Sequence, residues 1–215
     1  MKILEKLNIH AHDLSLYKRA FTHTSYSNEH NCESYERLEF LGDAVLELIM
    51  SDYLYKERHL EEGTMTKMRS SYVCEEACAT YSTDLGFKDY ILLGSGESEA
   101  TVPILADVFE SFVGATYLDQ GFAFTNEFVL KVITKYINKG IDFLHDYKSE
   151  LQELVQTVKK SVVYEVIDEK GPAHDKTFTC QVKVDDVVMG KGTGTSKKNA
   201  EQAAAKVALS KQVKI

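Results

Sequence analysis

The stretch "ERLEFLGDAVLEL", residues 36–48, decides the fold class of the first two thirds of the chain. Its leucines and valine recur at intervals of three and four residues, which predicts a helix. The three carboxylates, Glu36, Glu39 and Asp43, follow the same spacing. At about 100° per residue they fall on one helix face together with Phe40. A helix with so much to bury therefore gathers three negative charges on one side.

A second acidic pair lies downstream in "ILADVFESFVGATYL", residues 104–118, where Asp107 and Glu110 are three residues apart in another apolar helix. Two such helices packed side by side would bring Glu36, Asp43, Asp107 and Glu110 around one point. Four clustered carboxylates would repel one another and raise one another's pKa, and a divalent cation would remove that cost. Ligands that are all oxygen favour Mg²⁺ or Mn²⁺.

Two other interpretations of these acids stay open at this point. Acidic residues at helical spacing often form a solvated face or pair with basic side chains, and Arg37 and Arg69 are available as partners. A di-iron carboxylate site is the second alternative. Such bundles use Glu-x-x-His on two helices, and the residue three positions after the first acid of each pair here is Glu rather than His.

Composition and charge narrow the class of protein. The chain has 215 residues and is 44% hydrophobic, with no apolar run near the ~20 residues of a membrane span. Its first residues lack the features of a secretory signal, and its four cysteines form no CxxC pair. We expect a cytoplasmic protein with reduced thiols, no membrane partner and no small-molecule organic cofactor. Residues 1–145 carry a net charge of −10 and residues 146–215 carry +2, an asymmetry that suggests two parts with different partners.

The chain divides near residue 145 into a helical part and a mixed part. Up to residue 143 the periodicity predicts helices over 14–22, 33–58, 64–83, 103–119 and 124–139. After it comes a short amphipathic helix, then strands with apolar residues at every second position from Phe178 to Val184. An alanine-rich helix follows, with Thr195 or Ser196 as its N-cap. The order of the second part is thus α-β-β-β-α in about 70 residues.

These motifs together resemble the ribonuclease III family of endoribonucleases specific for double-stranded RNA. "ERLEFLGDAVLEL" resembles the family's signature helix, and "LADVFESFVGATYLDQG" its second catalytic helix. "AFTHTSYSNEH" resembles a segment of the family that carries His-x-Ser, here His23 and Ser25, and "EEGTMTKMRSSYV" a further stretch. The last 70 residues resemble a double-stranded-RNA-binding domain. The resemblance implies an all-α endonuclease domain, residues 1–143, followed by a small α+β (α-β-β-β-α) binding domain, residues 146–215.

The resemblance also implies roles for single residues of the first domain. Glu36, Asp43, Asp107 and Glu110 would be the catalytic residues and would hold Mg²⁺, for which Mn²⁺ would be a substitute. Glu39 and Glu62 would support them, with Glu62 approaching the RNA near the cut. Phe40 would insert into a second subunit of a homodimer; without the resemblance it reads equally well as an ordinary core residue.

In the second domain the resemblance implies three zones that contact the RNA. Gln152 and Glu153 would meet 2′-hydroxyls, His174 would reach the next minor groove, and Lys197 and Lys198 would contact phosphates at a helix N-terminus. Two departures from the family pattern are visible. Glu201 stands where many related domains have a third lysine, and the segment "SEATVP" is short and carries no basic residue.

The expected activity is Mg²⁺-dependent hydrolysis of double-stranded RNA, leaving 5′-phosphate and 3′-hydroxyl ends with two-nucleotide 3′ overhangs. The family implies a role in processing ribosomal-RNA precursors and other transcripts, including mRNA. The chief alternative is a double-stranded-RNA-binding protein that does not cleave. A helical carboxylate metalloprotein unrelated to RNA is a third interpretation, and the C-terminal pattern argues against it.

Overall fold

The computed structural model describes residues 1–57, 59–144, 146–171 and 176–212. The chain divides into two compact units, Met1–Leu144 and His145–Ile215, and each is described by itself. Within the described residues no helix combines the length and the apolar character needed to cross a membrane.

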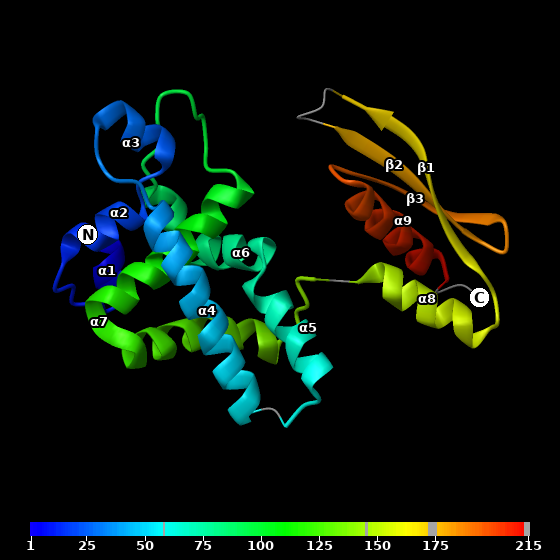
Figure 1. Ribbon diagram of the computed structural model, residues 1–215, viewed down its shortest axis with the longest axis horizontal. Coiled ribbons are helices and arrows are strands. Elements are labelled where there is room, and N and C mark those ends of the chain that lie inside the picture. Colours follow the sequence, from blue (N-terminus) through cyan, green and yellow to red (C-terminus); the bar gives the residue numbers. More distant parts are fainter. Residues whose placement is uncertain (58, 145, 172–175, 213–215) are drawn as a thin grey trace. The chain divides into compact units, whose positions relative to one another are not determined.

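The first unit is built from helices, as the sequence predicts. Figure 1 shows the two longest of them, α4 and α7, packed against each other, and α2, α5 and α6 pack around this pair. Their buried side chains form a single core, in which the rings of Phe21, Phe87 and Phe112 lie 4.7–5.8 Å apart. The helices of this unit are α1 (Lys2–Lys6), α2 (Leu14–Ala20), α3 (Thr24–His30), α4 (Glu36–Glu57), α5 (Glu62–Val73), α6 (Glu75–Leu85), the 3-10 helix η1 (Phe87–Tyr90) and α7 (Val102–Asn138).

Two regions test the predicted continuity of the helices, and one of them differs from the prediction. The helix expected over 64–83 is two helices, α5 and α6, because Cys74 between them is extended, with φ −73° and ψ 163°. The two helices expected over 103–119 and 124–139 are confirmed: they share the label α7, but Gly121, with non-helical φ 77° and ψ 174°, separates two helical segments. Gly121 has φ 77°, a conformation that glycine adopts without strain.

The second unit has the predicted order of elements: α8 (Tyr147–Thr157), β1 (Val162–Lys170), β2 (Thr177–Val184), β3 (Val187–Gly194) and α9 (Lys197–Gln212). The strands form one antiparallel sheet in the order β1-β2-β3. The predicted alternation in β2 is confirmed, since Cys180, Val182 and Val184 are buried. The hydroxyl of Ser196 accepts a hydrogen bond from the Asn199 N–H, which makes Ser196 the N-cap of α9.

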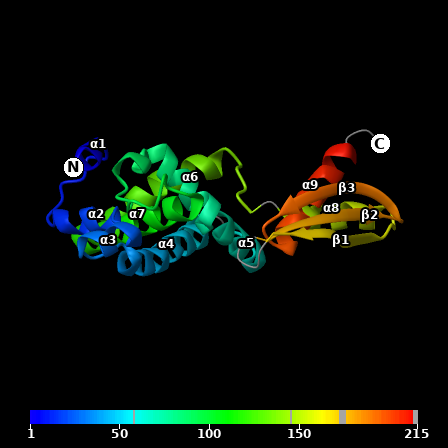
Figure 2. The same cartoon turned by 90° about the horizontal axis from the view of Figure 1, so that it is seen from above.

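Both helices of this unit contribute to one core with the sheet, and the unit can be followed in Figure 2. The alanines of α9 pack against the glycines of β3 at backbone distance. A Cβ atom at Gly190 would lie 2.2 Å from the Ala204 carbonyl oxygen, and one at Gly192 would lie 2.3 Å from the Ala204 nitrogen. Small side chains on both elements therefore set how closely α9 lies on the sheet.

Candidate active site

Two glycines bring α4 and α7 into backbone contact next to the predicted acidic residues. A Cβ atom at Gly42 would lie 1.7 Å from the carbonyl oxygen of Glu110, and a Cβ atom at Gly114 would lie 2.3 Å from that of Leu38. No larger residue fits at either position without separating the helices. Because Asp43 follows Gly42, this crossing carries its side chain to the helix that bears Glu110.

The structure assembles acidic residues from both helices into one electrostatic cluster. Burial, together with repulsion from Asp43, Glu39 and Asp107, raises the pKa of Glu110 to about 8. Burial also raises the pKa of Glu39 to about 7, with added repulsion from Asp107, Glu36 and Asp43. We call these five side chains the carboxylate cluster: Glu36, Glu39, Asp43, Asp107 and Glu110.

Asp107 accepts a hydrogen bond from a side chain far away in the sequence. The Tyr35 hydroxyl donates to its Oδ2 atom over 2.9 Å. Burial raises the pKa of Asp107, while this hydrogen bond and the nearby His23 lower it in part. Sequence reasoning did not find Tyr35, because 72 residues separate it from Asp107 and no periodicity links them.

Glu36 and Glu39 occupy different parts of the carboxylate cluster. Glu39 is partly buried, and its charge raises the pKa of Glu110 by repulsion. Glu36 is exposed and accepts a hydrogen bond from the Ser34 hydroxyl over 3.1 Å. Glu36 raises the pKa of Glu39 but is not among the charges that act on Glu110. The helix crossing therefore turns Glu39, more than Glu36, toward the centre of the cluster.

Basic partners do not neutralise the carboxylate cluster. None of the ion pairs between described residues includes one of its five members. Arg69, considered above as a partner, instead donates to the Ser51 hydroxyl over 3.2 Å. The buried thiol of Cys78 on α6 is a further neighbour of Glu110 that the sequence did not reveal.

The donor set of the cluster fits a hard divalent cation. All its ligating atoms are carboxylate oxygens, and their mutual repulsion is the cost that a bound cation would remove. Within the described residues no three His, Cys, Asp or Glu side chains form a group that could already hold a metal ion. Side-chain rotation about the fixed α4–α7 contact would have to bring the oxygens together.

The other predicted residues lie outside this cluster. Glu62 is exposed at the start of α5, where it accepts a hydrogen bond from the Thr66 hydroxyl over 3.1 Å. Gln152 and Glu153 are exposed on α8, and Lys197 and Lys198 are exposed at the start of α9. His174 falls outside the described residues.

The structure shows the pairing of Glu201 and the exposure of Phe40, which the sequence alone left open. Glu201 pairs with Lys148 over 2.5 Å, so its charge is compensated by a lysine from α8. Phe40 is 83% exposed and is not a core residue of this unit.

Comparisons with known proteins agree with this combination of domains. Residues 13–137 match a family model described as Ribonuclease-III-like, and residues 147–212 match the double-stranded RNA binding motif. A curated protein named Ribonuclease 3 from Onion yellows phytoplasma is 43% identical over 217 residues, which cover 99% of this chain and 91% of that protein. Another of that name from Listeria welshimeri is 47% identical over 219 residues, with 97% and 95% covered.

Among solved structures, a nuclease domain of ribonuclease III from Campylobacter jejuni is similar, with 34% identity and a TM-score of 0.58. The match covers 62% of this chain and 95% of that one. That work describes structural flexibility in a region involved in dimer formation.

The fold and the two family models define an endoribonuclease that acts on double-stranded RNA: a helical nuclease domain followed by a double-stranded-RNA-binding domain. The chain belongs to the ribonuclease III family, whose members are metal-dependent nucleases.

Proposed function

We propose that the chain hydrolyses double-stranded RNA with Mg²⁺ held by the carboxylate cluster, and that Mn²⁺ can replace Mg²⁺. The observation that carries this proposal is the mutual repulsion of acids from α4 and α7, two helices whose backbones touch. Residues 1–143 would form the nuclease domain and residues 146–215 the binding domain. Family membership supports a cytoplasmic role in processing ribosomal-RNA precursors and other transcripts.

We assign Asp43, Asp107 and Glu110 as ligands of the cation. These three assignments have the strongest support, because Asp43 and Asp107 both raise the pKa of Glu110 by repulsion. Glu36 was the fourth ligand expected from sequence, with Glu39 in support. The burial of Glu39 and its action on Glu110 favour Glu39 as the fourth ligand and Glu36 as the outer, solvent-facing acid. When bound, Mg²⁺ would lower the pKa of a water molecule and offset charge on the phosphodiester.

The protein's own residues would orient the reacting groups. The α4–α7 contact fixes the backbones of Asp43 and Glu110 relative to each other, and the Tyr35 hydroxyl holds one oxygen of Asp107. Glu62 would approach the RNA next to the cut. The products would carry 5′-phosphate and 3′-hydroxyl ends, because water would attack phosphorus, the P–O3′ bond would break and the 3′ oxygen would leave with a proton.

The exposed polar side chains of the second unit are proposed to hold the duplex. Gln152 and Glu153 on α8 would meet 2′-hydroxyls, and Lys197 and Lys198 would bind phosphates at the N-terminus of α9. His174 is proposed for the neighbouring minor groove on the resemblance alone. Because Glu201 is paired with Lys148, it adds no uncompensated negative charge beside the two lysines.

The experiment that tests the proposed function is cleavage of a uniform RNA duplex of about 30 base pairs, which exceeds the ~16 base pairs that one binding domain spans. We expect cleavage with Mg²⁺ or Mn²⁺ and none with chelator, and products with two-nucleotide 3′ overhangs. Mapping the ends with phosphatase and with a 3′-end ligation assay checks the chemistry. Duplex binding without cleavage under every divalent cation would leave the non-cleaving binding protein as the function.

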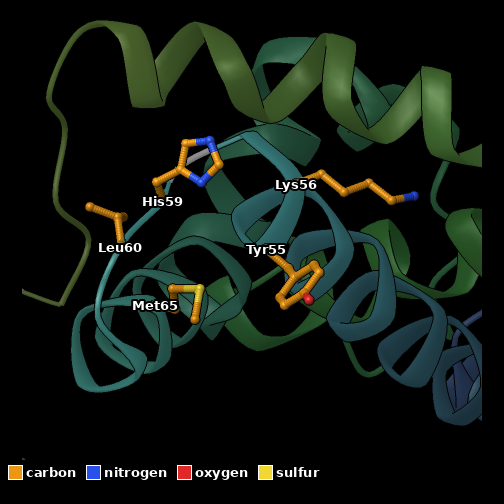
Figure 3. Close-up of a pocket in the computed structure, with 5 residues that line it drawn as sticks. All are labelled: Tyr55, Lys56, His59, Leu60 and Met65. Atoms are coloured by element: carbon orange, nitrogen blue, oxygen red, sulfur yellow. The ribbon is translucent and has the colours of Figure 1, made fainter.

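A homodimer is the proposed assembly, and an apolar stripe on α4 supports it. Phe40 is 83% exposed, Leu48 56% and Tyr55 76%. At about 100° per residue these positions lie within one sector of about 80°, and exposed apolar side chains gathered on one helix face are typical of an interaction site. Tyr55 also lines a pocket of about 440 Å³ with Lys56, His59, Leu60 and Met65, at the junction of α4 and α5 (Figure 3).

The stripe has the self-complementary layout that a two-fold interface requires. Leu48 lies midway between Phe40 and Tyr55 along α4. Two antiparallel copies of α4 that cross at Leu48 would place each Phe40 near the partner's Tyr55 and the pocket beside it. The region involved in dimer formation in the Campylobacter jejuni domain supports a dimer here as well.

Substitution of Phe40 by aspartate is expected to dissociate the dimer, because it puts a charge into the apolar stripe. The dissociation constant should rise at least tenfold, about 1.4 kcal/mol, as measured by analytical ultracentrifugation. Leu118→Asp is the matched control, since Leu118 is 53% exposed on α7 and off the stripe. A Phe40→Asp variant that dimerises like the wild type would contradict this interface.

A further inference from the structure

Tyr35 lies immediately before α4 and connects the first turn of that helix to α7. Its side chain is buried, and its hydroxyl donates to the Asp107 Oδ2 atom over 2.9 Å. Asp107 also belongs to the carboxylate cluster, where it raises the pKa of both Glu39 and Glu110. The tyrosine therefore contacts the cluster from the side of the core, away from the solvent that reaches Asp43.

The position of Tyr35 is fixed by a segment that has no other role in the proposed function. The Tyr35 N–H donates to the Thr22 carbonyl oxygen over 2.9 Å, and its ring lies 5.7 Å from the ring of His23. Thr22 in turn forms a parallel bridge with Leu92, whose carbonyl oxygen accepts from the His23 N–H over 3.1 Å. The segment at Thr22–His23, held by the segment at Leu92, thus fixes the position of Tyr35.

The His-x-Ser residues, His23 and Ser25, complete this support through hydrogen bonds to each other and to Gly94. The Nδ1 atom of His23 accepts from the Ser25 N–H over 3.2 Å and lies 2.7 Å from the Ser25 hydroxyl. That hydroxyl accepts from the Gly94 N–H over 2.9 Å. These hydrogen bonds hold residues 22–25 against residues 92–94. The ring of Tyr35 packs against the His23 ring of this paired segment.

We propose that Tyr35 is a positioning residue of the active site, which orients Asp107 for the divalent cation. The terminal torsion of an aspartate is broad, so an isolated carboxylate samples many orientations. The Tyr35 hydroxyl holds Oδ2 and leaves Oδ1 as the oxygen available to the cation. Donors behind metal-ligating carboxylates raise metal affinity by fixing the ligand in this way. This inference rests on the proposed function, because it needs a cation at the cluster.

The test is Tyr35→Phe, which keeps the buried ring and removes only the donor. Tyr17→Phe is the matched control: Tyr17 is fully buried in the same unit, and its hydroxyl donates to the Asp119 carboxylate over 3.0 Å, outside the cluster. Mn²⁺ affinity of each full-length variant is measured without RNA by electron paramagnetic resonance of the free ion. The Mg²⁺ concentration for half-maximal duplex cleavage and the melting temperature are measured in parallel.

We expect Tyr35→Phe to weaken Mn²⁺ binding about tenfold, the lower end of the effect of losing such a donor, and to raise the half-maximal Mg²⁺ concentration by a similar factor. Saturating Mg²⁺ should restore most of the cleavage rate. Tyr17→Phe should match the wild type in both metal measurements even if its melting temperature falls as far.

Two results would overturn the inference, and they can be told apart. Wild-type metal affinity in Tyr35→Phe, with cleavage still dependent on Mg²⁺, would remove the positioning role and leave the proposed function intact. A wild-type chain that binds no Mn²⁺ and cleaves equally well in chelator would remove both.

Discussion

Glu110→Gln is expected to abolish cleavage while leaving duplex binding unchanged. The substitution keeps the size of the side chain and removes one negative charge from the centre of the carboxylate cluster, where Asp43, Glu39 and Asp107 all act on it. An amide is a much weaker ligand for Mg²⁺ than a carboxylate. We expect a rate loss of at least a thousandfold, about 4 kcal/mol of activation free energy, in a single-turnover cleavage assay.

Binding should survive because the side chains proposed to hold the duplex, on α8 and α9, lie in the other unit. Gel-shift titration in chelator measures this directly. Glu127→Gln, an exposed acid on the same helix, controls for the loss of charge from α7. Lys197→Ala combined with Lys198→Ala should have the opposite effect, weaker binding with cleavage retained at saturating RNA. A Glu110→Gln variant that still cuts would remove Glu110 from the catalytic set.

The same single-turnover assay ranks the two glutamates of the first turn of α4. Glu39→Gln should cost more cleavage than Glu36→Gln, since Glu39 is the partly buried acid that acts on Glu110. Equal losses, or the reverse order, would restore Glu36 to the inner position expected from sequence.

The raised pKa of Glu110 also fixes the sign of its effect on stability. Its folded value of about 8 lies above the ordinary value of 4.5, so between these two pH values the folded state binds more protons than the unfolded state. Without metal, ionisation of Glu110 should therefore lower the free energy of unfolding as the pH rises from 4.5 toward 8. Glu110→Gln should remove this part of the pH dependence, and Mg²⁺ should stabilise the wild type more than the variant.

The sequence predicted the elements of this protein well because their periodicity is local. The acids of α4 and α7 recur at offsets of three and four, and the alternation around Val182 identifies β2 as a strand with one buried face. The break at Cys74 escaped prediction, since it carries neither Gly nor Pro and α6 begins without a side-chain cap. The division of α7 at Gly121 agrees with the two helices expected over 103–119 and 124–139.

The arrangement of the cluster was less accessible from sequence than its membership. Spacing on one helix puts Glu36 and Glu39 on the same face and cannot rank them, because their difference in burial arises from tertiary packing. Tyr35 and Asp107 meet only through tertiary structure. The exposure of Phe40 likewise depends on which side of α4 the other helices cover. Each of these properties depends on how helices pack in the folded unit, which no local sequence pattern encodes.

Gly42→Ala is the substitution expected to test that contact most severely. In a helix interior, alanine normally stabilises relative to glycine by about 0.5–1 kcal/mol. At Gly42 the new Cβ atom would lie 1.7 Å from the Glu110 carbonyl oxygen, and a backbone atom cannot rotate away as a side chain would. The helices must separate, so we expect destabilisation of about 3 kcal/mol, at the upper end for overpacked cores.

Thermal unfolding followed by circular dichroism measures this loss, which corresponds to a fall of about 10 °C in melting temperature for a unit of this size. Gly63→Ala is the matched control: Gly63 lies in helix α5 with nothing within 4 Å of the added atom, so it should leave the melting temperature unchanged or slightly higher. Because separation of α4 from α7 also moves Asp43 away from Glu110, the folded fraction of Gly42→Ala should bind Mn²⁺ weakly and cleave slowly. A Gly42→Ala variant with wild-type stability and wild-type cleavage would mean that the close backbone contact is not what assembles the carboxylate cluster.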